Sequence, residues 1–106
     1  MDKLVSEVLG IVLEEQRRAE EAHGALHSYN ECFGVLAEEV FEMRTAAEKL
    51  NAETMLGILD AIHAGGTDRI DTLADDLMDR AVLAAAEAVQ VAAVCRRIIQ
   101  HTDAGK

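Results

Sequence analysis

Residues 81–95 read AVLAAAEAVQVAAVC, and the rest of the chain is organised around this segment. Seven of its fifteen residues are alanine, the strongest helix former. Glu87 is its one charge, and Gln90 is its only other polar side chain apart from the Cys95 thiol. A helix that is apolar on nearly every side is usually buried on nearly every side. Because the segment is too short to span a bilayer, it predicts a helix enclosed by other helices.

Glu87 and Gln90 are three residues apart, so both side chains lie on one side of the predicted helix. A carboxylate in apolar surroundings is costly unless something pairs with it. Three interpretations are open. Glu87 binds a metal together with acids from another helix, pairs with a basic residue, or lies at an edge and reaches water.

The composition indicates one all-α domain over residues 1–106. Half of the 106 residues are apolar, which excludes a disordered segment. The chain has no proline, no tryptophan and few aromatic residues. It also lacks the alternating pattern of strands. We therefore expect a bundle of about four helices.

The formal net charge of −10 restricts the partners. Phosphate backbones and anionic membranes bind clustered lysine and arginine, so we expect neither nucleic acid nor membrane as a partner. Divalent cations suit such a charge, although many acidic proteins are simply soluble. Cys32 and Cys95 lie within helical patterns and are read as buried thiols in a reducing compartment. The N-terminus has no signal-peptide pattern, which predicts a cytoplasmic protein.

The first helix is predicted over residues 2 to about 23, with Gly24 ending or kinking it. Its second half is the charged run EEQRRAEEAH, residues 14–23. The spacing predicts i,i+4 pairs of Glu14 with Arg18 and of Arg17 with Glu21. We interpret this run as a solvated face.

The second helix is predicted from a capping box at Ser28 and Glu31 to about Leu50. One face is apolar and consists of Tyr29, Phe33, Leu36, Val40, Met43 and Ala47. A different face carries four acids, Glu31, Glu38, Glu39 and Glu42. Four acids there repel one another, so this face is either solvated or bound to a cation that offsets the repulsion.

A shorter helix is predicted over residues 51–64, and Gly65-Gly66 is the clearest break in the chain. The last helix then runs to near His101. Its first part repeats the acidic spacing at Asp75, Asp76 and Asp79. Because a clean apolar face stands opposite these aspartates, we interpret them as solvated. The four histidines are too scattered for a zinc site and are read as surface or capping residues.

Two acidic motifs together carry a family resemblance. They are Glu38-Glu39-x-x-Glu42, within HSYNECFGVLAEEVFE at residues 27–42, and Glu87-x-x-Gln90, within EAVQVAAVCRRII at residues 87–99. The chain resembles the MazG-like all-α nucleoside triphosphate pyrophosphohydrolases, and most of all the small MazG-like proteins of phages and prophages. The first helix and residues 51–80 are similar only in being helical.

The resemblance implies a MazG-like bundle that assembles with further copies into a homodimer or homotetramer. It also implies Mg²⁺-dependent hydrolysis of a nucleoside triphosphate to the monophosphate and pyrophosphate, with Mn²⁺ as a substitute. Glu39, Glu42, Glu87 and Gln90 would be the metal ligands. Glu38 would be a further ligand or would orient the attacking water.

Two departures from the family pattern bear on activity. Gln90 stands where the family has an aspartate, and residues 51–80 lengthen the gap between the motifs. Either the metal site is altered or Asp75, Asp76 or Asp79 contributes to it. The alternative function is therefore a catalytically degenerate helical interaction module, or a nucleotide-sensing one.

Overall fold

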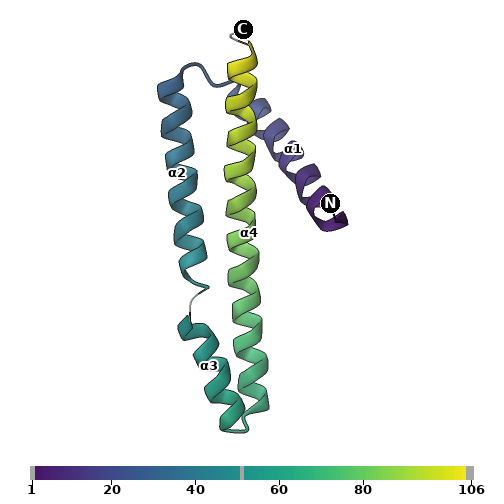
Figure 1. The fold of residues 1–106 in the computed structure, drawn as a ribbon, viewed down its shortest axis with the longest axis vertical. Coiled ribbons are helices and arrows are strands. Elements are labelled where there is room, and N and C mark those ends of the chain that lie inside the picture. Colours follow the sequence, from purple (N-terminus) through teal and green to yellow (C-terminus); the bar gives the residue numbers. More distant parts are fainter. Residues whose placement is uncertain (1, 51, 105–106) are drawn as a thin grey trace.

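The computed structural model describes residues 2–50 and 52–104, except for the side chains of residues 52–53 and 67–68. This part of the chain folds into four helices without a strand (Figure 1), which confirms the all-α prediction. The helices are α1 (Lys3–His23), α2 (Tyr29–Glu48), α3 (Ala52–His63) and α4 (Thr67–Ala104). Asn51, the expected first residue of the third helix, lies outside the described residues.

Helix α4 is the axis of the molecule and contacts each of the other three helices. Its 38 residues span about 57 Å at 1.5 Å per residue, close to the 62 Å long axis of the protein. Figure 1 shows α2 and then α3 lying end to end along α4, with α2 antiparallel to it. The two acid-bearing helices, α2 and α4, therefore pack antiparallel.

The helix ends follow the local signals. Ser28 Oγ accepts the Glu31 backbone N–H at 3.1 Å, and Glu31 Oε1 accepts the His27 backbone N–H at 3.1 Å. Gly24 ends α1 with a φ of 76°, a left-handed conformation that favours glycine. Gly65, at φ 72°, turns the chain from α3 into α4 in the same way.

Contacts near both ends of α2 hold this helix against α4. Leu26, in the α1–α2 loop, is buried. The Tyr29 ring meets the His101 ring edge to face, with centroids 5.2 Å apart. At the other end of α2, an Arg80 guanidinium N–H donates to the Lys49 carbonyl at 3.3 Å. These contacts set the register in which α2 runs along α4.

The core is small for a chain of this length. Among the residues whose side chains are described, seven apolar ones are buried: Val12, Leu26, Cys32, Ala46, Ala61, Ala93 and Val94. The radius of gyration is 18.3 Å, whereas a compact domain of this length has about 13 Å. Large apolar side chains therefore stay exposed on every helix, among them Ile11, Phe33, Phe41, Met55 and Val82.

The apolar face predicted for α2 is not buried as a whole. Tyr29 and Phe33 belong to it, yet they are 66% and 74% exposed. The buried residues of α2 are instead Cys32 and Ala46. Small side chains let a helix approach an alanine-rich partner closely, and large aromatic rings do not. The apolar face of α2 is consequently divided: Tyr29 and Phe33 are exposed, whereas Leu36, Val40 and Met43 are half-buried.

The two cysteines are free, with Cys32 buried and Cys95 half-buried. The interpretation as buried thiols is confirmed for Cys32 and only partly met by Cys95, and the reducing compartment stays a prediction. Within the described residues, no helix has the length and apolar character needed to cross a membrane.

Candidate functional site

Helices α2 and α4 meet along two stripes of residues with alternating three- and four-residue spacing, which keeps each stripe on one helix face. We call this contact the seam. On α2 the stripe is Cys32, Val35, Glu39, Glu42 and Ala46, and on α4 it is Leu83, Glu87, Gln90, Val94 and Arg97, with Glu42 and Leu83 exposed at the edge of the contact. The ends of the two stripes are mostly apolar. Their centre places carboxylates and an amide where apolar side chains would normally pack.

Three carboxylates of the seam converge. Glu39, Glu42 and Glu87 each offer an oxygen, and these oxygens all lie within 4.8 Å of one another. We call these residues the carboxylate trio. The prediction that Glu87 faces the acids of α2 is confirmed. Among the described residues no basic side chain forms an ion pair with Glu87, so the interpretation by simple pairing is not met.

The trio carries an electrostatic cost that falls on Glu39. Burial raises the pKa of the Glu39 carboxyl above its usual range, and the neighbouring charges of Glu42, Glu87 and Glu38 raise the same pKa further. Each of these effects disfavours the charged carboxylate. A divalent cation held by the trio would reverse them, because it supplies positive charge at the point of repulsion.

Glu38 lies beside this centre but outside the trio. Its side chain is exposed on α2, and its charge acts on Glu39. The expected role of Glu38 as a further ligand or as a residue that orients water stays a prediction.

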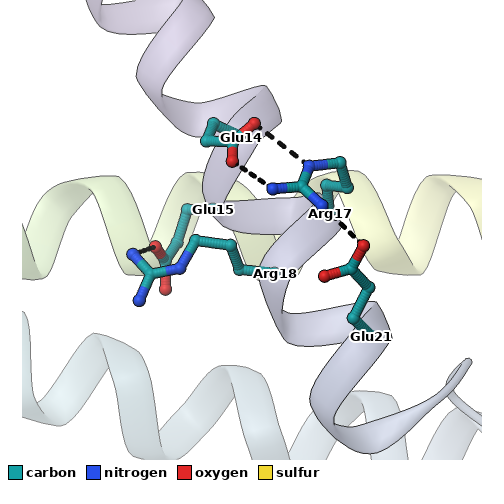
Figure 2. A network of polar contacts seen from close by, with 5 residues as sticks. All are labelled: Glu14, Glu15, Arg17, Arg18 and Glu21. Atoms are coloured by element: carbon teal, nitrogen blue, oxygen red, sulfur yellow. Dashed lines mark hydrogen bonds and ion pairs between the residues drawn. The ribbon is translucent and has the colours of Figure 1, made fainter.

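Gln90 lies next to the trio and holds α1 in place. Its amide Nε2 donates to Glu15 Oε1 at 2.9 Å, and Glu15 Oε2 in turn meets an Arg18 guanidinium nitrogen at 3.3 Å. Figure 2 shows Glu15 and Arg18 on one side of α1, with Arg17, Glu14 and Glu21 turned to the other. The expected role of Gln90 as a metal ligand stays a prediction.

These contacts correct the interpretation of the charged run on α1. Arg18 pairs with Glu15 rather than with Glu14, because Glu14 is bonded to Arg17. The pair of Arg17 with Glu21 is confirmed. Part of the run is also withdrawn from water, since the Glu15 side chain is 21% exposed. This side of the run faces α4, because Glu15 accepts a hydrogen bond from Gln90 of that helix.

A cavity of about 650 Å³ lies between α1, α2 and α4 and reaches the trio at Glu39. Its volume is in the range of small-molecule sites. Apolar walls come from Leu26, Val35 and Val94. Six further lining residues are charged or titratable, namely Glu15, Arg18, His23, His27, Glu31 and Arg97. The cavity therefore joins the carboxylate centre to a region that carries both cationic and acidic side chains.

Four residues of the cavity wall were not singled out as site residues from the sequence. Arg18 was assigned to a solvated face, and His23 and His27 were read as surface or capping residues. Arg97 entered only as part of a similar segment. A usable signal existed for Arg97, because it follows Gln90 by seven residues, which is two helical turns on the same face.

The aspartates of the inserted segment do not join the site. Within the described part of the chain, the trio is the one group of three or more metal-ligating side chains. Asp76 forms an ion pair with Arg80 at 2.9 Å, and Asp75 and Asp79 are exposed. Their interpretation as solvated acids agrees with this, and the alternative that they complete the metal site does not.

Comparisons of the chain with family models, with curated proteins and with solved structures returned no match.

The chemistry of the site follows from its oxygen atoms. Mg²⁺ prefers carboxylate oxygens in near-octahedral geometry and usually keeps several waters. Three carboxylates at the edge of a cavity can satisfy part of such a shell and leave positions for water and for oxygens of a ligand. The arrangement suits metal-assisted chemistry on an anionic ligand.

Proposed function

We propose that the protein is a Mg²⁺-dependent hydrolase that cleaves a nucleoside triphosphate into the monophosphate and pyrophosphate. One observation carries the proposal: Glu39 belongs both to the carboxylate trio and to the wall of the 650 Å³ cavity. A metal held by the trio would therefore face a ligand in the cavity. The resemblance of both acidic motifs to MazG-like pyrophosphohydrolases supplies the reaction.

In this proposal Glu39, Glu42 and Glu87 hold Mg²⁺, with the Gln90 amide oxygen as a weaker ligand. The hydrogen bond to Glu15 uses the Gln90 amide nitrogen and leaves the amide oxygen as the atom that would ligate. When bound, Mg²⁺ neutralises phosphate charge and lowers the pKa of a coordinated water. Glu38 orients the attacking water from the exposed side of α2. The reducing cytoplasm suits both the substrate and the two free thiols.

The test is pyrophosphate release over a panel of nucleoside triphosphates, with Mg²⁺, with Mn²⁺ and with a chelator. We expect metal-dependent release by the wild type and a loss of roughly 100-fold or more in Glu87→Gln. Asp75→Asn removes a carboxylate from an exposed position of the same helix and is expected to leave the rate unchanged. Absence of release from every nucleotide with either metal would refute the enzymatic function.

The second candidate is a helical module that binds a nucleotide or a protein partner without turnover. The bond from Gln90 to Glu15 favours it, because the family aspartate at this position would repel Glu15 rather than donate to it. This candidate predicts nucleotide binding or partner binding with no pyrophosphate release. The same wild-type assay separates the two functions.

We also propose that the chain works as a homodimer or homotetramer. The outward face of α2 bears a groove of about 340 Å³ lined by Phe33, Leu36, Val40 and Phe41 among others. Exposed apolar patches of this kind on a small protein mark interaction sites. A second copy would cover such a face with equally apolar helix surface.

A further inference from the structure

Arg97 is a buried cation without a carboxylate partner. Its residue is 9% exposed, and none of the ion pairs among the described residues involves it. One guanidinium nitrogen donates to the Gly24 carbonyl at 3.2 Å. The Nε–H has no hydrogen-bond partner in the described structure. A buried charge in this state is costly, and an orphaned buried donor calls for a specific explanation.

The surroundings of Arg97 supply room for an anion. Arg97 lines the 650 Å³ cavity together with the cationic or protonatable side chains Arg18, His23 and His27 and the acids Glu15, Glu31 and Glu39. Arg97 is the one of these cations that is buried and has no acidic partner among the described residues. Arg18 is paired with Glu15, and His27 lies 3.7 Å from a Glu31 oxygen, so both have acidic neighbours of their own. Arg97 also borders a second cavity that contains Glu20, but the Glu20 carboxylate accepts a hydrogen bond from Gln16.

We propose that Arg97 anchors a phosphate-binding subsite in this cavity, assisted by Arg18, and that this subsite binds phosphate without metal. The planar guanidinium presents its donors in a fork that matches phosphate oxygens. The Nε–H is closed off from the cavity, so it would reach a bound phosphate only after the Arg97 side chain turns. In a chain with a net charge of −10, an anion is held only where local cations outweigh the overall repulsion.

The position of Arg97 gives the subsite a role in the proposed function, on which this step rests. Arg97 follows Gln90 by seven residues, which places it about 10 Å along α4 from the trio end of the cavity. A ligand bound by metal at Glu39 and by Arg97 must therefore extend over several atoms and carry phosphate at both ends of that span. A nucleoside triphosphate or another polyphosphate has this form, whereas a single phosphate fills only one end.

The experiment measures binding of pyrophosphate and of inorganic phosphate in the presence of a chelator, by calorimetry, for the wild type and three variants. Arg97→Lys keeps the charge but removes the Nε–H and the fork, and we expect affinity to fall tenfold or more. Arg18→Gln and Arg17→Gln form a matched pair, because both remove an exposed arginine from adjacent positions of α1. Of these two arginines, only Arg18 lines the cavity. Figure 2 shows the two side chains on different sides of α1.

We expect Arg18→Gln to weaken binding several-fold and Arg17→Gln to leave it unchanged. Undetectable binding by the wild type would overturn the proposal, and so would equal effects of the two α1 variants or full affinity in Arg97→Lys. If Arg97→Lys does not fold, the Nε–H resonance of Arg97 in ¹⁵N-labelled wild-type protein decides the matter. It must shift on addition of pyrophosphate, and an unmoved resonance would overturn the proposal.

The failures of the two proposals are distinguishable. Phosphate binding in chelator without any triphosphate hydrolysis would refute the enzyme and leave the subsite standing. Metal-dependent hydrolysis with no binding of pyrophosphate or phosphate in chelator would refute the subsite and leave the enzyme standing.

Discussion

Burial and neighbouring acids disfavour the charged form of the Glu39 carboxyl. Burial and three neighbouring acids raise the pKa of its carboxyl from the ordinary value of 4.5. Between 4.5 and the raised pKa, the native state holds a proton that the unfolded state has released. The contribution of Glu39 to stability is therefore best below pH 4.5 and declines as the pH rises through this window.

The first prediction follows from that sign. In chelator, the melting temperature of the wild type should fall relative to that of Glu39→Gln as the pH rises from 4.5 through the raised pKa of Glu39. Thermal unfolding followed by circular dichroism at several pH values measures the difference. Asp75→Asn, which neutralises an exposed acid, serves as the control and should track the wild type. A constant difference between wild type and Glu39→Gln would show that Glu39 is not under strain.

Gln90 serves two demands at once, since its amide donates to Glu15 and it lies where the family has an acidic ligand. The second prediction separates these demands. Gln90→Asp should strengthen Mg²⁺ binding by adding a charged ligand, yet destabilise the metal-free protein by about 1–3 kcal/mol, because Glu15 loses its donor and faces a like charge.

The double variant Glu15→Gln, Gln90→Asp reverses donor and acceptor, and it should recover much of the lost stability while keeping the tighter metal binding. Calorimetric Mg²⁺ titration and urea unfolding measure both effects. If Gln90→Asp leaves metal affinity unchanged, position 90 does not face the metal.

At the scale of the elements, α2 and α4 form an antiparallel pair whose centre is polar. Apolar residues at both ends of the seam hold the helices together, and the helices hold the trio within 4.8 Å. Like charges brought together in a half-buried seam lower stability. A local loss of stability of this kind is characteristic of functional sites.

The third prediction is that Mg²⁺ or Mn²⁺ stabilises the folded protein. At ten times the dissociation constant the gain is about 1.4 kcal/mol, which corresponds to several degrees in melting temperature for a domain of this size. Differential scanning fluorimetry measures the shift. Glu87→Gln should abolish it, and Asp75→Asn should leave it nearly intact. An equal shift in wild type and Glu87→Gln would place the cation elsewhere.

The fourth prediction replaces the seam acid on α4 by an apolar residue. Glu87→Leu should raise the free energy of unfolding of the metal-free protein by roughly 1 kcal/mol or more, because it removes repulsion and buries apolar surface. It should also remove the metal-induced stabilisation. Urea unfolding in chelator measures the first effect. Destabilisation by Glu87→Leu would mean that the seam needs a carboxylate for its own packing.

At the scale of the whole molecule, an extended chain of four helices leaves much apolar surface in water. The most exposed large rings are Phe33 at 74% and Phe41 at 69%, both on the outward face of α2. The molecule measures 62 × 29 × 24 Å and is elongated along α4. A single copy could bury this apolar surface only if α4 were broken into shorter helices.

The fifth prediction concerns assembly. The wild type should sediment as a homodimer or homotetramer at micromolar concentration, and Phe33→Asp should weaken the association by about 2 kcal/mol or more. Asn30→Asp adds the same charge at an exposed polar position of α2 and should leave the assembly unchanged. Sedimentation equilibrium measures all three proteins. A monomeric wild type would contradict the prediction.

The sequence by itself determined the elements and part of the site. Helix periodicity, the Ser28 cap and the glycines at 24 and 65 act over a few residues, so they predict helix ends without knowledge of the fold. The lone acid of the alanine-rich segment likewise pointed to partners on another helix, because an isolated carboxylate among apolar residues needs one.

Only the tertiary structure decided which face of each helix is used. Helix α2 has an apolar face and an acidic one, and periodicity alone favoured burial of the apolar face. The register with α4 places the stripe from Cys32 to Ala46 against the alanine-rich helix, because the small side chains at its ends admit close approach. This register brings Glu39 and Glu42, which lie between those ends, to Glu87. The contact of Gln90 with Glu15 and the position of Arg97 in the cavity depend on how α1 crosses α4. No pattern within a single helix encodes that crossing.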